Sequence, residues 1–222
     1  MNFLSIFDVI GPNMIGPSSS HTAGAVSIAL MARNLFSEKI KSVRFTLYGS
    51  FSKTYQGHGT DRALLGGILG FSTDDERIRD AFDHAKKLGI AYEYIIDELT
   101  VTNHPNTADI ELTGVTGRKM TIRGESIGGG KMKIVRIDHI DVEFTGEYST
   151  LIVHQMDKPG VVAHITQALS EYNVNIAFMR LFREEKGAAA YTVVESDEKI
   201  PVAVLDQIRN NEHVSDLMLI QA

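Results

Sequence analysis

The chain has 222 residues, of which 43% are hydrophobic and 23% are charged, the proportions of a soluble globular protein with one or two domains. Its net charge of −6, and the lack of a long apolar run or a basic leader, give no reason to expect nucleic-acid binding, a membrane segment or a signal peptide, so we expect a cytoplasmic protein. It contains no cysteine, which excludes disulfides, thiolate metal sites and an iron–sulfur cluster held by this chain itself.

A run of hydroxyl side chains and one histidine precedes an apolar pattern that predicts a helix over residues 22–37. The backbone N–H groups at a helix start are unpaired and carry a partial positive charge. No acidic residue occurs between Asp8 and Glu38, so this helix start suits an external carboxylate or phosphate. An ordinary serine cap after the Gly16-Pro17 turn explains the pattern equally well. The candidate ligand-binding residues here are Ser18, Ser19, Ser20, His21 and Thr22.

The next predicted elements are a strand over residues 43–51 and helices over 60–70 and 74–88. Thr73 and Glu76 have the spacing of a capping box, and Gly89 stands where a C-terminal glycine belongs. Because the third helix brings its own acidic residues to its start, we expect it to be purely structural.

A histidine between two glycines lies before the helix over 60–70, in Gly57-His58-Gly59-Thr60-Asp61. Glycines let the backbone approach a ligand closely. The segment is not a dinucleotide-binding loop, because Arg62 stands where the third glycine should be. Taken alone, a turn in which Thr60 or Asp61 caps the next helix is the more ordinary explanation.

Residues 90–144 carry a pattern of strands, expected at 90–96, 108–113, 118–124, 131–137 and 139–144. Two polar clusters interrupt them. Asn103-His104-Pro105-Asn106 is a turn whose histidine is ordinarily a solvated surface residue, and Glu125-Ser126-Ile127-Gly128-Gly129-Gly130-Lys131 fails the P-loop spacing and is ordinarily a hinge or a strand bulge. No zinc motif is present, and we expect no metal ligand. A helical segment followed by strands predicts an α+β domain over residues 1–146.

The remaining residues, 147–222, predict a second, smaller domain. Strands are expected at 149–156, 174–183, 189–195 and 217–220, with helices over 161–172 and from Pro201, a favourable first-turn residue. The order βαββαβ is that of a ferredoxin-like fold. The last strand, Leu217-Met218-Leu219-Ile220, is apolar enough to favour self-association of this domain.

Taken together, Gly16-Pro17-Ser18-Ser19-Ser20-His21-Thr22, Gly57-His58-Gly59-Thr60-Asp61, His104-Pro105-Asn106 and Ser126-Ile127-Gly128-Gly129-Gly130 resemble the beta subunit of the two-subunit bacterial iron–sulfur L-serine dehydratases. The resemblance extends over essentially the whole chain, and the second domain resembles an ACT domain. It implies that L-serine loses water to give aminoacrylate, which hydrolyses to pyruvate and ammonia. The 4Fe-4S cluster would be bound by cysteines of a partner alpha subunit and would act on the substrate hydroxyl as a Lewis acid.

Because the cluster belongs to the partner, the resemblance implies that this chain contributes the residues that hold the substrate carboxylate and the base that removes a proton. Ser18, Ser19, Ser20 and Thr22 would hold the carboxylate, and His21 would be the base, with His104 as its rival. Asp61 would orient a histidine or accept the substrate ammonium. Further substrate-binding candidates are Gly59 and Thr60 in the same segment, and Asn106 in the 103–106 turn.

The ACT resemblance implies an amino-acid effector site, commonly formed across a dimer of such domains. Its residues would be Asp157, Gly160, Val161, Asn175 and Ile176. Asp157 stands where some amino-acid-binding members carry asparagine, and its charge would repel a carboxylate. The alternative function is a non-catalytic amino-acid-sensing protein, in which the anion-binding serines are needed but His21 and His104 are dispensable.

Overall fold

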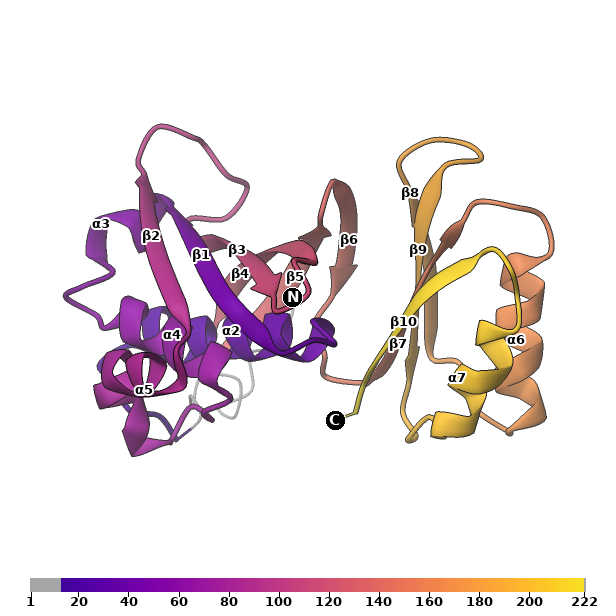
Figure 1. The fold of residues 1–222 in the computed structure, drawn as a ribbon, viewed down its shortest axis with the longest axis horizontal. Helices are drawn as coiled ribbons and strands as arrows, with labels where there is room; N and C mark the ends of the chain where they lie inside the picture. The colour runs from indigo at the N-terminus through magenta and orange to yellow at the C-terminus, as the bar shows by residue number, and fades with distance from the viewer. Residues whose placement is uncertain (1–12, 222) are drawn as a thin grey trace, which may run out of the picture. The chain divides into compact units, whose positions relative to one another are not determined.

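The computed structural model describes residues 13–221. The chain divides into two compact units, one ending at Asp138 and the other beginning at His139 (Figure 1). Each unit combines one sheet with helices, which confirms the expected α+β class with two domains. No helix within residues 13–221 is both long and apolar enough to cross a membrane.

The first unit is built on a mixed sheet with strand order β2-β1-β3-β4-β5. Strands β1 and β2 are parallel, because helices occupy the connection between them, whereas the later strands follow through shorter connections and pair antiparallel. Their bounds are β1 Ile40–Tyr48, β2 Ala91–Asp97, β3 Thr107–Gly114, β4 Lys119–Gly128 and β5 Lys131–Ile137. The strands predicted between residues 90 and 137 are therefore confirmed, with shifted ends.

Three longer α-helices of this unit pack in a series, in which α4 contacts both of the others: α2 Gly24–Leu35, α4 Thr60–Leu69 and α5 Ala81–Leu88. Helix α2 contacts α4, β4 and β5, and most of its apolar residues are completely buried, among them Val26, Ile28 and Leu35. It begins two residues later than predicted, because Ser19–Ala23 form a separate π-helical turn before it. The hydroxyl-rich segment is thus fixed to a helix that is largely buried in the core of the unit.

The strand predicted to reach residue 51 ends at Tyr48, and a short helix α3 (Gly49–Thr54) follows it. Gly49 makes the turn with a φ of +55°, and a Cβ there would lie 2.6 Å from the carbonyl oxygen of Pro105. The residues after Tyr48 therefore leave the sheet and approach the 103–106 turn, a tertiary contact that the strand-like sequence of Phe51 and its neighbours does not reveal.

The helix predicted over 74–88 is two elements, a 3₁₀-helix at Glu76–Asp80 and then α5. The capping box was wrong: Asp75 accepts the N–H of Arg77 at 2.9 Å, and Thr73 donates to the carbonyl of Asn13. Gly89 is confirmed as the terminating residue, with a φ of +69°.

The second unit has a four-stranded sheet with order β10-β7-β9-β8 and two helices, α6 and α7 (Figure 1). Its elements are β6 Ile140–Phe144, β7 Ser149–Met156, α6 Val161–Glu171, β8 Phe178–Arg183, β9 Ala189–Ser196, α7 Val202–Arg209 and β10 Val214–Ile220. From β7 onward the order is the predicted βαββαβ. Strand β8 begins four residues later than expected, and Pro201 precedes α7 as its N-cap instead of lying in its first turn.

Candidate functional site

The four polar clusters of the first unit meet at one end of its sheet. Tyr48 and Asp97, the last residues of β1 and β2, are paired, so both parallel strands finish there. Strand β3 starts at the same end, since Ala108 pairs with Leu47, and Thr107 in turn pairs with Glu125 near the end of β4. Figure 1 shows α3 and the loop between β2 and β3 at this end. Segments more than 100 residues apart in the sequence therefore contribute to one place.

The hydroxyl-rich turn is held in part by its own cap. Ser18 Oγ accepts the N–H of His21 at 3.1 Å, so the serine-cap interpretation is right for this residue. Ser19 and Ser20 are half-buried, and no hydrogen-bond partner of their hydroxyls is found among the described residues. Thr22 is almost completely buried and donates to the carbonyl of His58 at 3.1 Å. The hydroxyls of Ser18 and Thr22 therefore stabilise the turn, whereas those of Ser19 and Ser20 remain available to bind a ligand.

His21 lies between three segments. Its Nε2 is 2.9 Å from Ser50 Oγ, and its Nδ1 is 3.4 Å from Ser18 Oγ. The His21 ring also lies against Phe51 and against His58, whose ring centroid is 4.8 Å away. Burial, and next the charge of nearby His58, lower the pKa of His21. His21 is therefore a neutral imidazole at neutral pH, the form that can accept a proton.

His58 is the residue that the sequence analysis did not choose. Its Nδ1 is buried, and no partner for this atom is found in the part of the chain that the structure describes. Buried polar atoms are rarely left unpaired unless a ligand, a water or a catalytic role accounts for them. In the sequence, the only sign of a role for His58 is its position between Gly57 and Gly59, which is equally typical of an ordinary turn. Its proximity to His21 is seen only in the structure.

The start of α4 differs from the expected capped turn. Gly59 is the N-cap residue, with a left-handed φ of +68°, and neither Thr60 nor Asp61 caps the helix. Thr60 is fully buried, and its Oγ1 has no partner in the described residues. Asp61 accepts the N–H of Arg62 at 2.8 Å, and partial burial raises the pKa of its carboxyl. Thr60 and His58 therefore leave two polar atoms unsatisfied within three residues.

The 103–106 turn is attached to the site through its backbone. The carbonyl of Pro105 accepts the N–H of Ser50 at 2.6 Å, and the carbonyl of Asn106 accepts the N–H of Ser126 at 2.9 Å. Asn106 Oδ1 is a third buried polar atom of this site without a partner among the described residues. His104 Nδ1 accepts the N–H of Asn106 at 3.2 Å, so this ring nitrogen is already engaged within the turn.

The glycine-rich segment after Glu125 is the end of β4, with a register irregularity between Ser126 and Gly128, as the strand-bulge interpretation expected. Ser126 is fully buried and donates to the carbonyl of Ser20 at 2.8 Å. A Cβ on Gly24 would collide with Ser126 Oγ. The absence of a side chain at Gly24 therefore lets β4 hold the serine turn directly.

A cavity of about 360 Å³ opens beside His58 and Thr22. It is lined by Ile15, Gly16, Pro17, Thr22, Gln56, Gly57, His58, Gly59, Arg62, Ile78 and Arg79. The two arginines are exposed and favour an anionic ligand here. The sequence analysis did not select these arginines, because Arg62 and Arg79 lie on different helices and meet only in the folded chain. A group of three or more histidine or acidic residues able to hold a metal ion is absent from residues 13–221.

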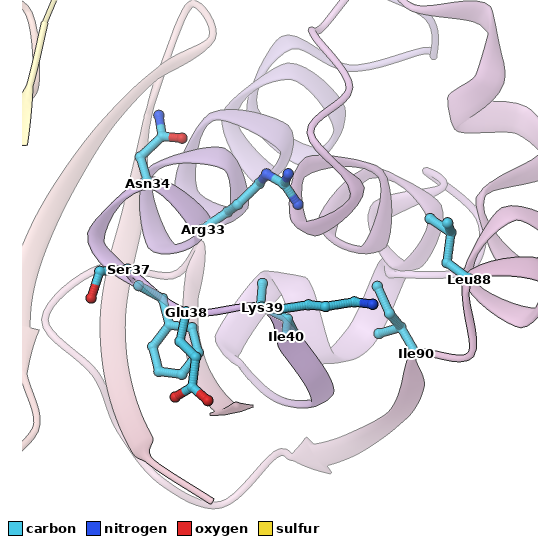
Figure 2. A pocket seen from close by; sticks show the side chains of 9 residues that line it. Arg33, Asn34, Ser37, Glu38, Lys39, Ile40, Leu88 and Ile90 are labelled. Atoms are coloured by element: carbon cyan, nitrogen blue, oxygen red, sulfur yellow. The ribbon is translucent and has the colours of Figure 1, made fainter. Parts of the chain in front are cut away.

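A larger cavity, of about 530 Å³, lies at the opposite end of β1 (Figure 2). It is formed by Arg33, Asn34, Phe36, Ser37, Glu38, Lys39, Ile40, Leu88 and Ile90. Figure 2 shows the Lys39 side chain extending toward Ile90, while Arg33 donates to the carbonyl of Ile68 at 2.8 Å. None of the predicted site residues lines this cavity, so its size alone does not make it the candidate site.

The candidate effector site of the second unit is closed by its own contacts. Asp157 Oδ2 lies 2.8 Å from Arg183 Nη1 and accepts the N–H of Gly187 at 3.1 Å. Together these bonds hold the pKa of the Asp157 carboxyl below its ordinary value. Gly160 is the N-cap of α6 with a φ of +90°, and Val161 is buried.

The second segment predicted for this site starts the chain toward β8. The N–H of Asn175 donates to Glu198 Oε2 at 3.3 Å, and Ile176 packs against the apolar core of the unit. Gln155 Oε1 and Thr192 Oγ1, on β7 and β9, are buried without partners in the described chain. Strands β7 and β9 therefore carry unpaired neutral oxygens, whereas the charge of Asp157 in the turn is already paired.

Comparison with known proteins agrees with this architecture. Residues 5–136 match the family model of the serine dehydratase beta chain, and residues 149–213 match the ACT domain. The probable L-serine dehydratase beta chain of Bacillus subtilis is 40% identical over 208 residues, which is 94% of each chain. The L-serine dehydratase beta chain of Peptoniphilus asaccharolyticus is 47% identical over 176 residues, 78% of this chain and 79% of the relative. The D-3-phosphoglycerate dehydrogenase of Bacillus subtilis is 23% identical over 197 residues, 88% of this chain but 37% of that enzyme. The chain belongs to the serine dehydratase beta-chain family and carries an ACT domain after it.

Proposed function

We propose that the chain is the substrate-anchoring and proton-transferring subunit of an L-serine dehydratase, which converts L-serine to pyruvate and ammonia. The observation that supports this most is the convergence of four segments on one place with three unpaired buried atoms, His58 Nδ1, Thr60 Oγ1 and Asn106 Oδ1. Two similar proteins that match most of this chain are named as L-serine dehydratase beta chains. The proposal assigns residues 1–146 to this function and 147–222 to the ACT domain.

The reaction needs an anchor for the carboxylate. In our proposal the available hydroxyls of Ser19 and Ser20 hold it, Thr22 and Ser18 keep the turn in shape, and Arg62 and Arg79 add positive charge at the rim of the cavity. A carboxylate held by several donors is oriented as well as bound, since hydrogen bonds to a charged acceptor are short and strong. Asp61 would receive the substrate ammonium in its ionised form.

The reaction also needs a base for the proton on the substrate Cα atom. His21 is neutral at neutral pH, and His58, beside it, has an unpartnered Nδ1. We propose that these two histidines form the proton-transfer pair, with His58 Nδ1 the atom free to take the proton and His21 packed at its ring. His104 stays the rival base, but its Nδ1 would first have to release the N–H of Asn106.

The departing hydroxyl group needs a Lewis acid, which the 4Fe-4S cluster of such dehydratases supplies when present. This chain does not fit that group, because it has no cysteine to ligate iron. In our proposal an alpha subunit holds the cluster and brings it to the end of the sheet where β1 and β2 finish.

Reconstitution tests the proposal. The isolated chain, purified anaerobically with iron and sulfide, should be colourless and inactive on L-serine, and adding the alpha chain of the same organism should give pyruvate in proportion to bound iron. Serine dehydration by this chain alone would contradict the two-subunit assignment, and an inactive complex with a full complement of iron would contradict the dehydratase assignment.

A second candidate function is favoured by the D-3-phosphoglycerate dehydrogenase of Bacillus subtilis, which matches 88% of this chain over part of its own length. In that alternative the chain is a non-catalytic sensor that binds an amino acid or another anion. A sensor needs the serine turn but no base. Normal serine binding together with unchanged activity after substitution of His21, His58 and His104 would favour it.

We further propose that the ACT domain self-associates and binds an amino-acid effector near Asp157, Gly160 and Asn175. Strand β10 is at one edge of the sheet, although the side chains of Leu217, Met218 and Ile220 are already buried. Sedimentation of the full chain and of a β10-edge variant, Leu219→Lys, tests the association. A strictly monomeric wild-type chain at high concentration would contradict it.

A further inference from the structure

The loop between β2 and β3 exposes two large apolar side chains. Leu99 is 93% exposed and Val101 is 95% exposed. Strand β2 adds Tyr92, Ile95 and Ile96, which are 40%, 40% and 37% exposed; Tyr92 and Ile96 lie on one face of this edge strand and Ile95 on the other. Single exposed apolar residues are common on soluble proteins, but five of them along one edge strand and the loop that follows it are typical of an interaction surface. We call these five residues the β2 apolar strip.

The loop is held in shape by its own hydrogen bonds. Asp97 Oδ1 accepts the N–H groups of Leu99 and Thr100 at 3.0 and 2.9 Å, and Asp97 Oδ2 accepts the Thr100 hydroxyl at 2.7 Å. These bonds lower the pKa of the Asp97 carboxyl, so it stays charged. Beyond Val101, Thr102 donates to the carbonyl of His104 at 2.7 Å. An ordered turn that presents apolar side chains loses little conformational entropy when a partner binds.

The β2 apolar strip is continuous with the candidate site. The loop leads directly into His104 and then into Pro105 and Asn106, whose carbonyls hold Ser50 and Ser126. Strand β2 is also the edge of its sheet, so its outer backbone groups are open to a partner. A chain seated on Leu99 and Val101 would therefore lie within a few residues of the site.

We propose that the β2 apolar strip is the docking surface for the cluster-bearing alpha chain, through an apolar pocket that receives Leu99 and Val101. This inference rests on the proposed function. The site needs iron that this cysteine-free chain cannot hold, and a partner carrying it must approach at the end where β1 and β2 finish. A second copy of this chain is the other conceivable occupant, but it would bring another chain without cysteine to the same place.

The test measures the affinity of the full-length chain for its alpha chain anaerobically, separately from serine dehydration. The variant is the double substitution Leu99→Asp and Val101→Asp. Placing charges in a desolvated interface centre should weaken binding at least about thirtyfold. The matched control is Val115→Asp, at a residue that is 57% exposed and lies beyond the other end of β1, next to Lys39. Its affinity should equal that of the wild type. Unchanged thermal melting of all variants shows that they fold.

The two readouts separate the two proposals. Equal affinity of the double variant and the wild type overturns the docking surface even if the complex is active. Weaker binding by the double variant alone supports the surface even if the complex proves inactive on L-serine, which counts against the proposed function only. A wild type that does not bind the alpha chain, or a double variant that loses only self-association, overturns the docking proposal.

Discussion

Two turns in this molecule lead into helices that have no acidic residue in their first turn, the Ser18–Ala23 turn before α2 and the Asp157–Gly160 turn before α6. Around the first, two other segments, 57–61 and 103–106, place buried polar atoms that have no partner in the described chain. At the second, Asp157 is already paired with Arg183 and with the N–H of Gly187.

The comparison shows that an open helix start is not sufficient evidence for a ligand site. Both turns begin such a helix, but among the described residues only the first turn is joined by distant segments whose buried hydrogen-bonding groups are unsatisfied. In the second unit the unpaired Gln155 and Thr192 oxygens lie on the sheet, while the charge at the turn is neutralised by its own chain. In our proposal the first turn receives an anion, whereas at the second turn the charge of Asp157 is already paired with Arg183. Five predictions test this difference.

The largest effect is expected at the histidines. In the reconstituted complex, His58→Ala and His21→Ala should each lower kcat about 10²–10⁴-fold, the usual contribution of a general base and its environment. His104→Ala should retain most activity, because its Nδ1 is engaged within its own turn. Initial rates must be compared at equal iron content and equal binding of the alpha chain.

A large loss of kcat in His104→Ala alone would identify His104 as the base and contradict the His21–His58 pair. Near wild-type kcat in all three variants would favour the sensor alternative.

Ser19→Ala should raise KM about 10- to 100-fold with little change in kcat, because a hydrogen bond to a charged group contributes about 1.5–3 kcal/mol. The Ser19 hydroxyl has no hydrogen-bond partner among the described residues and can therefore bind the carboxylate. The matched comparison is Ser18→Ala, whose Oγ caps His21 N; it should lower the melting temperature as well as raise KM. A KM defect in Ser18→Ala alone would contradict the assignment of Ser19 as a carboxylate anchor.

Gly24→Ala should destabilise the first unit by about 1–3 kcal/mol, because the new Cβ collides with buried Ser126 Oγ and the serine turn must move. Gly57→Ala is the control in the same region. Its Cβ would meet only the carbonyl of Thr54 at 3.7 Å, an ordinary contact. Urea unfolding monitored by circular dichroism measures both, and equal midpoints would show that β4 does not hold the turn tightly.

The pKa of His21 should rise toward its ordinary value in His58→Gln, since the charge of His58 is the second cause of its depression after burial. NMR titration of the His21 ring measures the change, and His104→Gln should leave it unaltered. Because the pKa of His21 is lowered by folding, the unfolded chain binds a proton at His21 more readily than the folded chain does. His21 therefore decreases the free energy of unfolding as the pH falls below about 6.5. A His21 pKa that is unchanged in His58→Gln would assign the whole depression to burial.

The smallest effect is expected for Asp157→Asn, because the ion pair with Arg183 is at the surface and is screened by solvent. Thermal stability should hardly change near neutral pH. Since the pKa of Asp157 is depressed, the stability that it contributes in the wild type is present above its ordinary pKa and is lost as the pH falls through the depressed value. Calorimetric titration with L-serine tests the effector site: binding that appears only in the asparagine variant would show that the Asp157 charge excludes the carboxylate.

The sequence by itself determined the elements and the ingredients of the site. Periodicity placed most strands and the helices α2, α4 and α6, and the βαββαβ order predicted the second fold, because burial of alternating or helical apolar faces is a local pattern. The absence of cysteine excluded a cluster in this chain, and the resemblance carried by the four polar clusters selected the family that the comparisons show.

Only the tertiary structure decided which polar residues act together. The pairing of β1 with β2 and β3 brings Ser50, His58 and the 103–106 turn to the serine turn, over separations that no local pattern records. The same pairing ends β1 at Tyr48, because Gly49 must approach Pro105 there. It also gives His58 its significance: a histidine between glycines is an ordinary turn in the sequence, and it becomes a candidate base only when burial leaves its Nδ1 without a partner in the described chain.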